Sequence, residues 1–274
     1  MLIEMYQVDS FASHAFEGNP AGVCISEFPL EEDLMLSIAA EMAVSETAFI
    51  NLSDKWLRWF TPEAEVTLCG HGTLAVAHIL RNKGLLSQGQ SISFETLSGE
   101  LTATILHDCI ELDFPRYELS DNSQMDKSIL AALGLKSRQV VSSCYFEDRL
   151  IIEVDNEESL FELSPNFNAL IKVKGRGIAV TTKSSANDVD FVSRYFAPWV
   201  GINEDPVTGS AQCALAEYWK GKLNKESFYV YQASRRGGYL GLRFNGDRVK
   251  IQGTAYTTIS GTLNLSKLKR VERS

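Results

Sequence analysis

The sequence predicts an α/β (α+β) protein of two similar domains, and three observations indicate that fold class. Many short segments rich in β-branched and aromatic residues are bounded by turn formers, which is typical of strands. Fewer stretches carry the spacing of a helix. A Phe-x-Pro triplet also precedes a glycine-rich turn twice, at Phe60-Thr61-Pro62 and at Phe196-Ala197-Pro198. The two triplets lie 136 positions apart, close to half of the 274 residues.

In the first half, two helices are expected among the strands. Apolar residues at i, i+4 and i+8 predict a helix within residues 29–42, which opens with acidic residues. A second helix is expected over Leu74–Leu80, directly after Cys69-Gly70-His71-Gly72-Thr73. The predicted strands are Ile3–Asp9, Thr47–Leu52, Trp56–Phe60, Ile92–Thr96, Leu101–Leu106 and Ile110–Phe114.

The second half repeats this style after a polar, proline-containing stretch over residues 115–124, which we interpret as a linker. A helix is predicted over Met125–Leu133 and another after Gly209. The linker divides the chain into domains of residues 1–115 and 116–261. The predicted strands lie at Val140–Tyr145, Leu150–Val154, Gly177–Thr182, Phe191–Tyr195, Phe228–Gln232, Tyr239–Phe244, Val249–Gln252 and Tyr256–Leu265.

Composition excludes several classes of function. Hydrophobic residues make up 45% and charged residues 22%, and the net charge is −9, so neither a nucleic-acid surface nor a polybasic membrane patch is expected. No apolar run reaches the length of a membrane span, and the first residues lack the pattern of a signal peptide. The 5 cysteines are scattered without C-x-x-C spacing, which predicts reduced thiols in the cytoplasm.

The two glycine-rich turns are candidate anion sites. A helix that begins there leaves backbone N–H groups unpaired at the positive end of its dipole, where a carboxylate or phosphate binds readily. One turn in each half would hold a small anionic metabolite between the domains. The alternative is two ordinary helix starts capped by Thr73 and Ser210. Neither turn matches a P-loop or dinucleotide fingerprint, so nucleotide binding is disfavoured.

Glu46, His71 and Asp205 are candidate acid/base residues. Glu46 lies between a helix and an apolar strand, where burial would raise its pKa toward neutrality. The His71 ring is expected in an exposed turn between glycines, where it could transfer a proton or simply face solvent. Asp205 precedes Pro206, where it serves either as a second acid/base group or in an Asx-type turn.

Cys69 is either a thiolate activated by the helix N-terminus or, as we prefer, a small buried hydrophobe. Ser210 together with His71 suggests a hydrolase, but the sequence has no G-x-S-x-G elbow. The other histidines lack the spacing of a metal site, so no metal is expected.

Taken in order, these motifs resemble the PhzF family of phenazine-biosynthesis-like isomerases along nearly the whole chain. The specific combination is Ser45-Glu46-Thr47, Gly70-His71-Gly72-Thr73 and the stretch from Glu204 to Ala211, supported by Gly18-Asn19-Pro20-Ala21. The resemblance implies a diaminopimelate epimerase-like fold, in which each domain is a β-barrel-like sheet around a central helix. It also implies a homodimer without cofactor or metal, and a first domain completed by residues near 262–274.

By the same resemblance, Glu46 matches the proton-shuttling glutamate, and His71, Asp205 and Ser210 match polar groups that assist it. The family's substrate-holding motifs contain Asn19, Gly72, Thr73 and Gly209. Epimerases of similar fold use one thiol from each half. Here the position seven residues after each proline holds a thiol in the first half and a carboxylate in the second, so a two-thiol racemase is disfavoured.

We therefore expect a cofactor-independent isomerase that moves a proton on a small carboxylate-bearing substrate, with Glu46 as the acid/base group. Two alternatives stay open. One is an epimerase or racemase that uses Cys69 as one base. The other is a non-catalytic small-molecule binding protein of the same fold.

Overall fold

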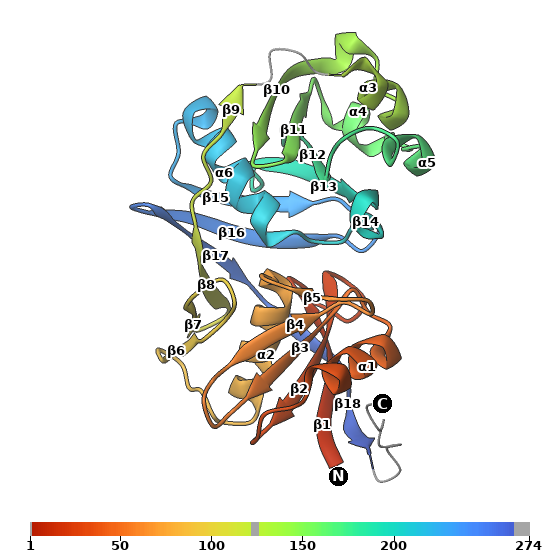
Figure 1. Cartoon of the computed structure of the whole chain (residues 1–274). Coiled ribbons are helices and arrows are strands. Elements are labelled where there is room, and N and C mark those ends of the chain that lie inside the picture. Colours follow the sequence, from red (N-terminus) through yellow and green to blue (C-terminus); the bar gives the residue numbers. More distant parts are fainter. Residues whose placement is uncertain (1, 122–125, 266–274) are drawn as a thin grey trace.

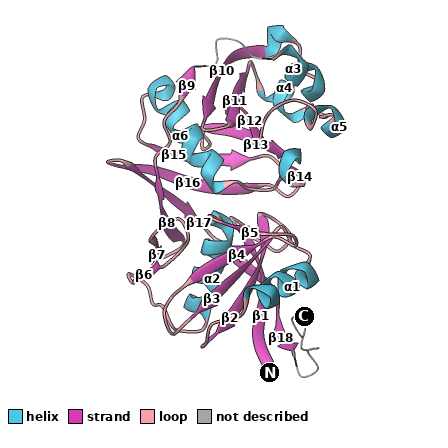
Figure 2. Cartoon of the chain, viewed as in Figure 1, coloured by secondary structure: helices cyan, strands magenta, loops and turns pink. Residues whose placement is uncertain are grey.

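The computed structural model describes residues 2–121 and 126–265 of the chain. Strands dominate the molecule, as Figure 2 shows. The first half contains β1 (Leu2–Ser10), β2 (Asn19–Ser26), α1 (Glu32–Met42), β3 (Glu46–Asn51), β4 (Leu57–Phe60), β5 (Glu65–Val66), α2 (Gly70–Asn82), β6 (Ser91–Phe94), β7 (Leu101–Ile105) and β8 (Ile110–Pro115).

The second half adds strands, shorter helices and one long helix. Two 3-10 turns also occur, at Ser137–Gln139 and Pro198–Val200. The elements are β9 (Ser120–Asp121), α3 (Lys127–Leu133), β10 (Val140–Phe146), β11 (Arg149–Val154), α4 (Glu157–Phe161), α5 (Phe167–Leu170), β12 (Gly177–Lys183), β13 (Phe191–Ala197), β14 (Ile202–Asp205), α6 (Gly209–Leu223), β15 (Ser227–Gln232), β16 (Gly238–Asn245), β17 (Arg248–Gly253) and β18 (Ala255–Asn264).

The strands form two sheets. The smaller sheet has six strands in the order β18-β1-β2-β3-β4-β5. The larger has twelve, in the order β6-β7-β8-β17-β16-β15-β13-β12-β11-β10-β9 with β14 paired to β13. The α+β fold class is therefore confirmed. Within the described residues the two strand orders are open, so the closed, barrel-like shape expected for each domain is not observed.

One long helix is enclosed by strands in each half of the molecule (Figure 1). Helix α2 packs against β1, β2, β3, β7, β8 and β18, and α6 packs against β8, β16 and β17. Most of the apolar residues of α2 are fully buried, as expected for a helix that is hydrophobic on every side. They include Leu74, Ala75, Val76, Ala77, Ile79 and Leu80.

The two halves are joined by strand pairing as well as by the polypeptide connection. Strand β8 pairs with β17, so the larger sheet runs through both halves. Strand β18 then pairs antiparallel with β1 from Leu2↔Asn264 to Ser10↔Ala255, at the end of the molecule opposite β10 (Figure 1). The part of the expected 262–274 segment beyond residue 265 lies outside the described residues, as does Met125 of the predicted helix. The domain boundary near residue 115 stays a prediction.

Within the described ranges, no helix is both long enough and apolar enough to cross a membrane.

Candidate active site

A cavity of about 900 Å³ opens where the first turns of α2 and α6 meet. A Cβ atom placed on Gly70 would lie 3.9 Å from the Cα atom of Gly209, so the two helix starts are in near contact. Residues of both halves line the cavity, among them Glu46, Cys69, Gly70 and His71 from the first half and Asp205, Thr208, Gly209 and Ser210 from the second. Five of the eight predicted site residues therefore line this one cavity.

Helix α2 begins earlier than the sequence indicated, and the alternative in which Thr73 and Ser210 cap the two helices is wrong. Cys69 is the N-cap of α2, and its sulfur accepts a hydrogen bond from the Gly72 N–H at 3.3 Å. Thr73 lies within the first turn and donates to the Cys69 carbonyl at 2.7 Å. At α6 the N-cap position is Thr208, so Ser210 also lies inside the helix. First-turn N–H groups lack acceptors within their own helix, so both helix starts offer amide donors at the cavity.

Glu46 and His71 form an ion pair at the cavity wall. Glu46 is the first residue of β3, and its side chain is 14% exposed. His71 Nε2 lies 3.2 Å from Glu46 Oε2. The expectation of an exposed His71 ring is wrong, because the residue belongs to the first turn of α2 and is only 7% exposed. This position in the first turn of α2 places the ring against Glu46 at the start of β3.

The predicted rise in the pKa of Glu46 is also corrected. Burial does act to raise it, but His71 and the Ser45 hydroxyl outweigh burial and hold the pKa of Glu46 below its ordinary value. Burial disfavours the charged ring of His71, yet the acidic groups of Cys69 and Glu46 raise the pKa of His71 well above its ordinary value. Each partner thus favours the charged form of the other, the carboxylate of Glu46 and the protonated ring of His71.

Asp205 approaches the same cluster from the second half of the chain. The Asn19 side-chain amide donates to Asp205 Oδ1 at 2.7 Å and to the Val207 carbonyl at 2.9 Å. Thr208 Oγ1 donates to Asp205 Oδ2 at 2.5 Å. Burial raises the pKa of Asp205 to about 6, an effect that His71 opposes and Glu46 reinforces. A carboxyl group with such a pKa can accept or release a proton near neutrality.

Asn19 itself carries an unused acceptor. Its Nδ2 atom lies 3.4 Å from His71 Nδ1, so the residue touches both acid/base groups. Its Oδ1 atom is buried and has no hydrogen-bond partner within residues 2–121 and 126–265. Asn19, Gly72 and Thr73 do not line the cavity: Asn19 is fully buried, and a Cβ atom on Gly72 would come within 2.8 Å of Trp59. A substrate contact from these three residues stays a prediction.

Cys69 is buried, as preferred from the sequence, but it also belongs to the acid/base cluster. Its sulfur lies 3.5 Å from His71 Nδ1, and burial raises the pKa of the thiol. The idea of a thiol activated by the helix N-terminus is therefore not supported. Ligand atoms of Glu46, Cys69 and His71 lie within 4.8 Å of one another, close enough to hold a metal ion. A metal needs the thiolate form of cysteine, which the raised pKa disfavours.

Three further polar residues were not singled out from the sequence: Thr208 and Arg149, which line the cavity, and Ser45, which contacts His71. Ser45 Oγ lies 3.4 Å from His71 Nε2, and Thr208 binds Asp205. Both lie inside the recognised motifs, so the motifs could have indicated them. Arg149 Nη1 donates to Ser210 Oγ at 3.0 Å, and it comes from a strand start that carries no motif.

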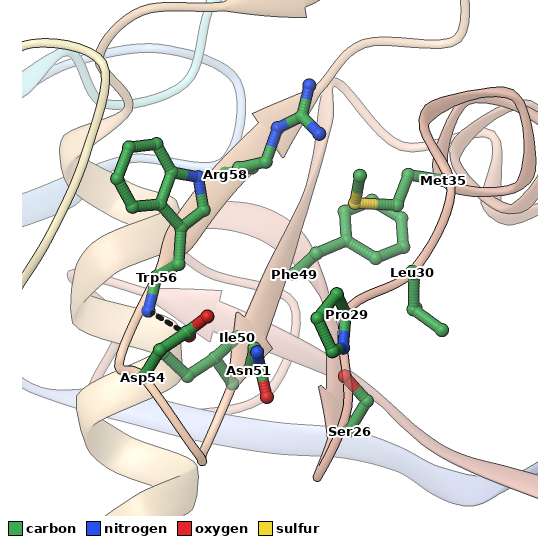
Figure 3. Close-up of a pocket in the computed structure, with 10 residues that line it drawn as sticks. All are labelled: Ser26, Pro29, Leu30, Met35, Phe49, Ile50, Asn51, Asp54, Trp56 and Arg58. Atoms are coloured by element: carbon green, nitrogen blue, oxygen red, sulfur yellow. Dashed lines mark hydrogen bonds between the residues drawn. The ribbon is translucent and has the colours of Figure 1, made fainter.

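A smaller hollow of about 100 Å³ lies elsewhere, beside β3 and β4 (Figure 3). Its polar contacts are those of surface turns and ion pairs: Trp56 N donates to Asp54 Oδ1 at 2.9 Å, and Arg58 binds Glu32 and Glu65. It gathers no buried acid/base pair. The cavity between the helix starts is the candidate active site.

Known proteins resemble this chain along nearly its whole length. A family model described as phenazine biosynthesis-like protein matches residues 8–261. The chain belongs to the phenazine biosynthesis-like (PhzC-PhzF) family. An uncharacterized isomerase of Halalkalibacterium halodurans is 45% identical over 267 residues, which cover 97% of this chain and 100% of that protein. A human phenazine biosynthesis-like domain-containing protein is 41% identical over 289 residues, covering 96% and 99%.

Solved structures agree with this assignment. The crystal structure of a PhzF-family protein from Enterococcus faecalis matches with a TM-score of 0.89 at 40% identity, over 97% of this chain and 100% of that one. A predicted epimerase from Pseudomonas aeruginosa shares the fold, with a TM-score of 0.76 at 20% identity over 95% and 99%. The PhzF-family chain is thus an enzyme of the isomerase type. The homodimer and the cytoplasmic location stay predictions.

Proposed function

We propose that this PhzF-family chain is a cofactor-independent isomerase that moves a proton between carbon atoms of a small carboxylate-bearing substrate. The observation that carries the proposal is the convergence of the Glu46–His71 ion pair and Asp205 on one cavity between two helix N-termini. Acid/base groups and amide donors thereby face one bound molecule.

In this mechanism Glu46 begins as the base. Its lowered pKa keeps it ionised at neutral pH, so it can accept a proton from a carbon next to an unsaturated or carboxylate group. The electron pair of the broken C–H bond is delocalised into that group. First-turn amides and the His71 imidazolium stabilise the resulting negative charge. Glu46 then returns the proton to a different carbon, and no electron acceptor is required.

Asp205 would tune the substrate, and Asn19 would hold the Asp205 carboxylate in position through its 2.7 Å hydrogen bond. The pKa of Asp205, near 6, allows it to exchange a proton with a polar substituent. General acid–base catalysis contributes about 10²–10⁴-fold. The remaining acceleration falls to the amide donors and to exclusion of water.

The test is the substitution Glu46→Gln, which keeps the shape of the side chain and removes its basicity. The enzyme would be incubated in D2O with a panel of unsaturated and hydroxy- or amino-substituted carboxylic acids, and deuterium incorporation measured by mass spectrometry. We expect wild type to label at least one compound and the variant to lose at least about 100-fold in rate. Glu118→Gln, an exposed glutamate lining the same cavity, is the matched control. Unchanged labelling by Glu46→Gln removes Glu46 from its role.

A second candidate is an epimerase in which the Cys69 thiol is one base. The observation in its favour is the thiol at the cavity wall, 3.5 Å from His71 Nδ1. This mechanism inverts one carbon instead of moving a proton between two. Chiral chromatography of the product therefore distinguishes it from the first proposal.

A further inference from the structure

Arg149 is a buried cation on the cavity wall that the proposed proton transfer does not use. It is the first residue of β11 and only 9% exposed. Its guanidinium carbon lies 4.4 Å from the centre of the Phe146 ring and 5.3 Å from that of Tyr117. Its Nη1 atom donates to the Ser210 hydroxyl at 3.0 Å, at the N-terminus of α6. The group is thus held rigidly beside amide donors.

The charge of Arg149 is compensated mainly from the solvent side. Its Nη2 atom binds Glu147, whose side chain is 54% exposed while that of Arg149 is 11% exposed. Glu147 lies in the tight turn between β10 and β11 and has a φ of 50°. In the described part of the chain, the buried Nε atom of Arg149 has no hydrogen-bond partner. A buried charge is costly unless it is well paired, so this guanidinium retains capacity for an anion.

The other two arginines of the cavity differ from Arg149. Arg116 forms a bidentate salt bridge with Glu217, with N···O distances of 2.6 and 2.7 Å. The side chain of Arg176 is 59% exposed, and its Nη1 lies 3.8 Å from Asp148. Among the described residues, neither of them is hydrogen-bonded to a helix start. Arg149 is therefore the cation whose position and burial suit recognition of a ligand.

We propose that Arg149 binds the carboxylate of the substrate, together with the Ser210 hydroxyl and the first-turn amides of α6. In the unliganded protein, Glu147 occupies the guanidinium in place of that carboxylate and swings outward when the ligand binds. Because Ser210 Oγ accepts from Arg149, its own proton is free to be donated to the ligand. That the bound carboxylate belongs to the substrate rests on the proposed function, whereas the binding of a carboxylate by Arg149 does not.

The lining of the cavity indicates the body of the ligand as well as its charge. Apolar side chains and two tyrosines face the same space as Arg149: Val66, Leu68, Phe114, Tyr117, Tyr195 and Val200. An organic carboxylate with an apolar or ring-shaped body fits this lining, because its charge meets Arg149 and its body meets apolar surface.

The experiment compares cyclohexanecarboxylate with cyclohexanecarboxamide, which have the same shape and differ in charge. Dissociation constants are measured by isothermal titration calorimetry on the full chain. We expect wild type to prefer the carboxylate by about tenfold or more, and Arg149→Met to reduce this ratio to about one. Arg149→Lys retains the positive charge but not the bidentate geometry of the guanidinium, so its ratio of carboxylate to carboxamide affinity should be intermediate. Arg176→Met is the matched control and should keep the wild-type ratio.

Glu147→Gln should have the opposite effect on carboxylate binding from the Arg149 substitutions. It leaves Arg149 in place and removes the resident carboxylate, so cyclohexanecarboxylate should bind more tightly while the carboxamide is unaffected. This variant also keeps the proposal testable if Arg149→Met does not fold. An unchanged carboxylate preference in Arg149→Met and Arg149→Lys, or weaker carboxylate binding by Glu147→Gln, overturns the proposal.

These binding results are independent of proton transfer. If Glu46→Gln leaves deuterium labelling unchanged while the Arg149 variants lose the carboxylate preference, the proposed function fails and the anion site stands. If labelling depends on Glu46 and the carboxylate preference does not depend on Arg149, the anion site fails alone.

Discussion

The two helix starts that meet at the cavity have similar backbones but different side chains. At the start of α2, a buried thiol caps the helix, and His71 pairs with Glu46 from a neighbouring strand. At the start of α6, Thr208 is at the N-cap position and binds Asp205, and Arg149 binds the helix start through Ser210. The repeated backbone brings amide donors to the cavity twice. In the two proposals above, proton transfer is carried out mainly by side chains at the start of α2, and the anion is bound by side chains at the start of α6.

The largest expected effect comes from removing the cation on the α2 side. His71→Gln should lower the rate of deuterium labelling about 100-fold or more, since it removes stabilisation of the anionic intermediate. It should also shift the pH dependence. Glu46 acts when ionised, so activity is lost as pH falls through its pKa, which His71 holds below the ordinary value. Without His71 that pKa rises, and the acid limb of the pH–rate profile moves to higher pH.

His78→Gln is the control for this comparison. His78 lies on the same helix, far from the cluster, and bonds Thr257 Oγ1 at 3.0 Å. Its removal should leave the acid limb in place. An unmoved limb in His71→Gln would show that the ion pair does not set the ionisation of Glu46.

At the start of α6, Asp205→Asn should increase stability at alkaline pH. Because the folded pKa of Asp205 is raised from 3.8 to about 6, the folded protein binds this proton more tightly than the unfolded chain. Stability is therefore greatest below the unfolded pKa and falls as pH rises to about 6. Removing the carboxylate should raise the free energy of unfolding at pH 8 by about 2 kcal/mol, somewhat less than the roughly 3 kcal/mol equivalent to the whole change in pKa.

Urea unfolding at pH 8, 6 and 4.5 measures this effect, and the gain should shrink toward the lowest pH. Asp113→Asn is a control of opposite sign. Burial acts to raise the pKa of Asp113, but hydrogen bonds from Lys250 and Arg248 lower it. Its removal should therefore cost stability at neutral pH, with the cost fading as pH falls through the folded pKa. A gain for Asp205→Asn that is independent of pH contradicts the assigned titration.

Cys69→Ser should have a smaller effect and separates the two proposed reactions. Serine can still accept the hydrogen bond from Gly72, so the helix cap is retained. The raised pKa of the thiol makes it a poor base, and we expect labelling to fall by only about threefold. A loss approaching that of Glu46→Gln, together with inactivation of wild type by iodoacetamide, would favour the epimerase.

Much of the fold could be predicted from the sequence because local patterns decide it. Alternating apolar residues predicted most of the longer strands, and the repeated Phe-x-Pro triplet indicated two related halves. Strand β2 was missed because Pro20 and Gly22 are ordinarily strand breakers. The structure explains the glycine, since a Cβ atom there would lie 2.5 Å from Thr47 Oγ1 of the adjacent strand β3. Such close approach of two strands has no local signal.

The candidate site could be predicted only as far as its motifs extend. Ser45, Glu46 and Asp205 lie in recognisable stretches, but the environment of each is set by segments distant in the chain. The sequence predicted a raised pKa for Glu46 because burial is visible locally and the approach of His71 is not. The place of Arg149 in the site could not be predicted for the same reason, because its partner Ser210 is 61 residues away in the sequence.

The smallest expected effect is that of metal removal. Glu46, Cys69 and His71 could supply three ligand atoms within 4.8 Å of one another, all on the α2 side. In the proposed mechanism the Glu46 carboxylate must be free to take a proton, so a bound ion would block the base instead of assisting it. Exhaustive dialysis against EDTA should leave deuterium labelling unchanged, and added Zn²⁺ should inhibit it. Cys69→Ser should weaken this inhibition, because it removes the softest ligand. Loss of labelling after dialysis, restored by a metal ion, would instead assign the cluster to metal-assisted chemistry and reverse the division between the two helix starts.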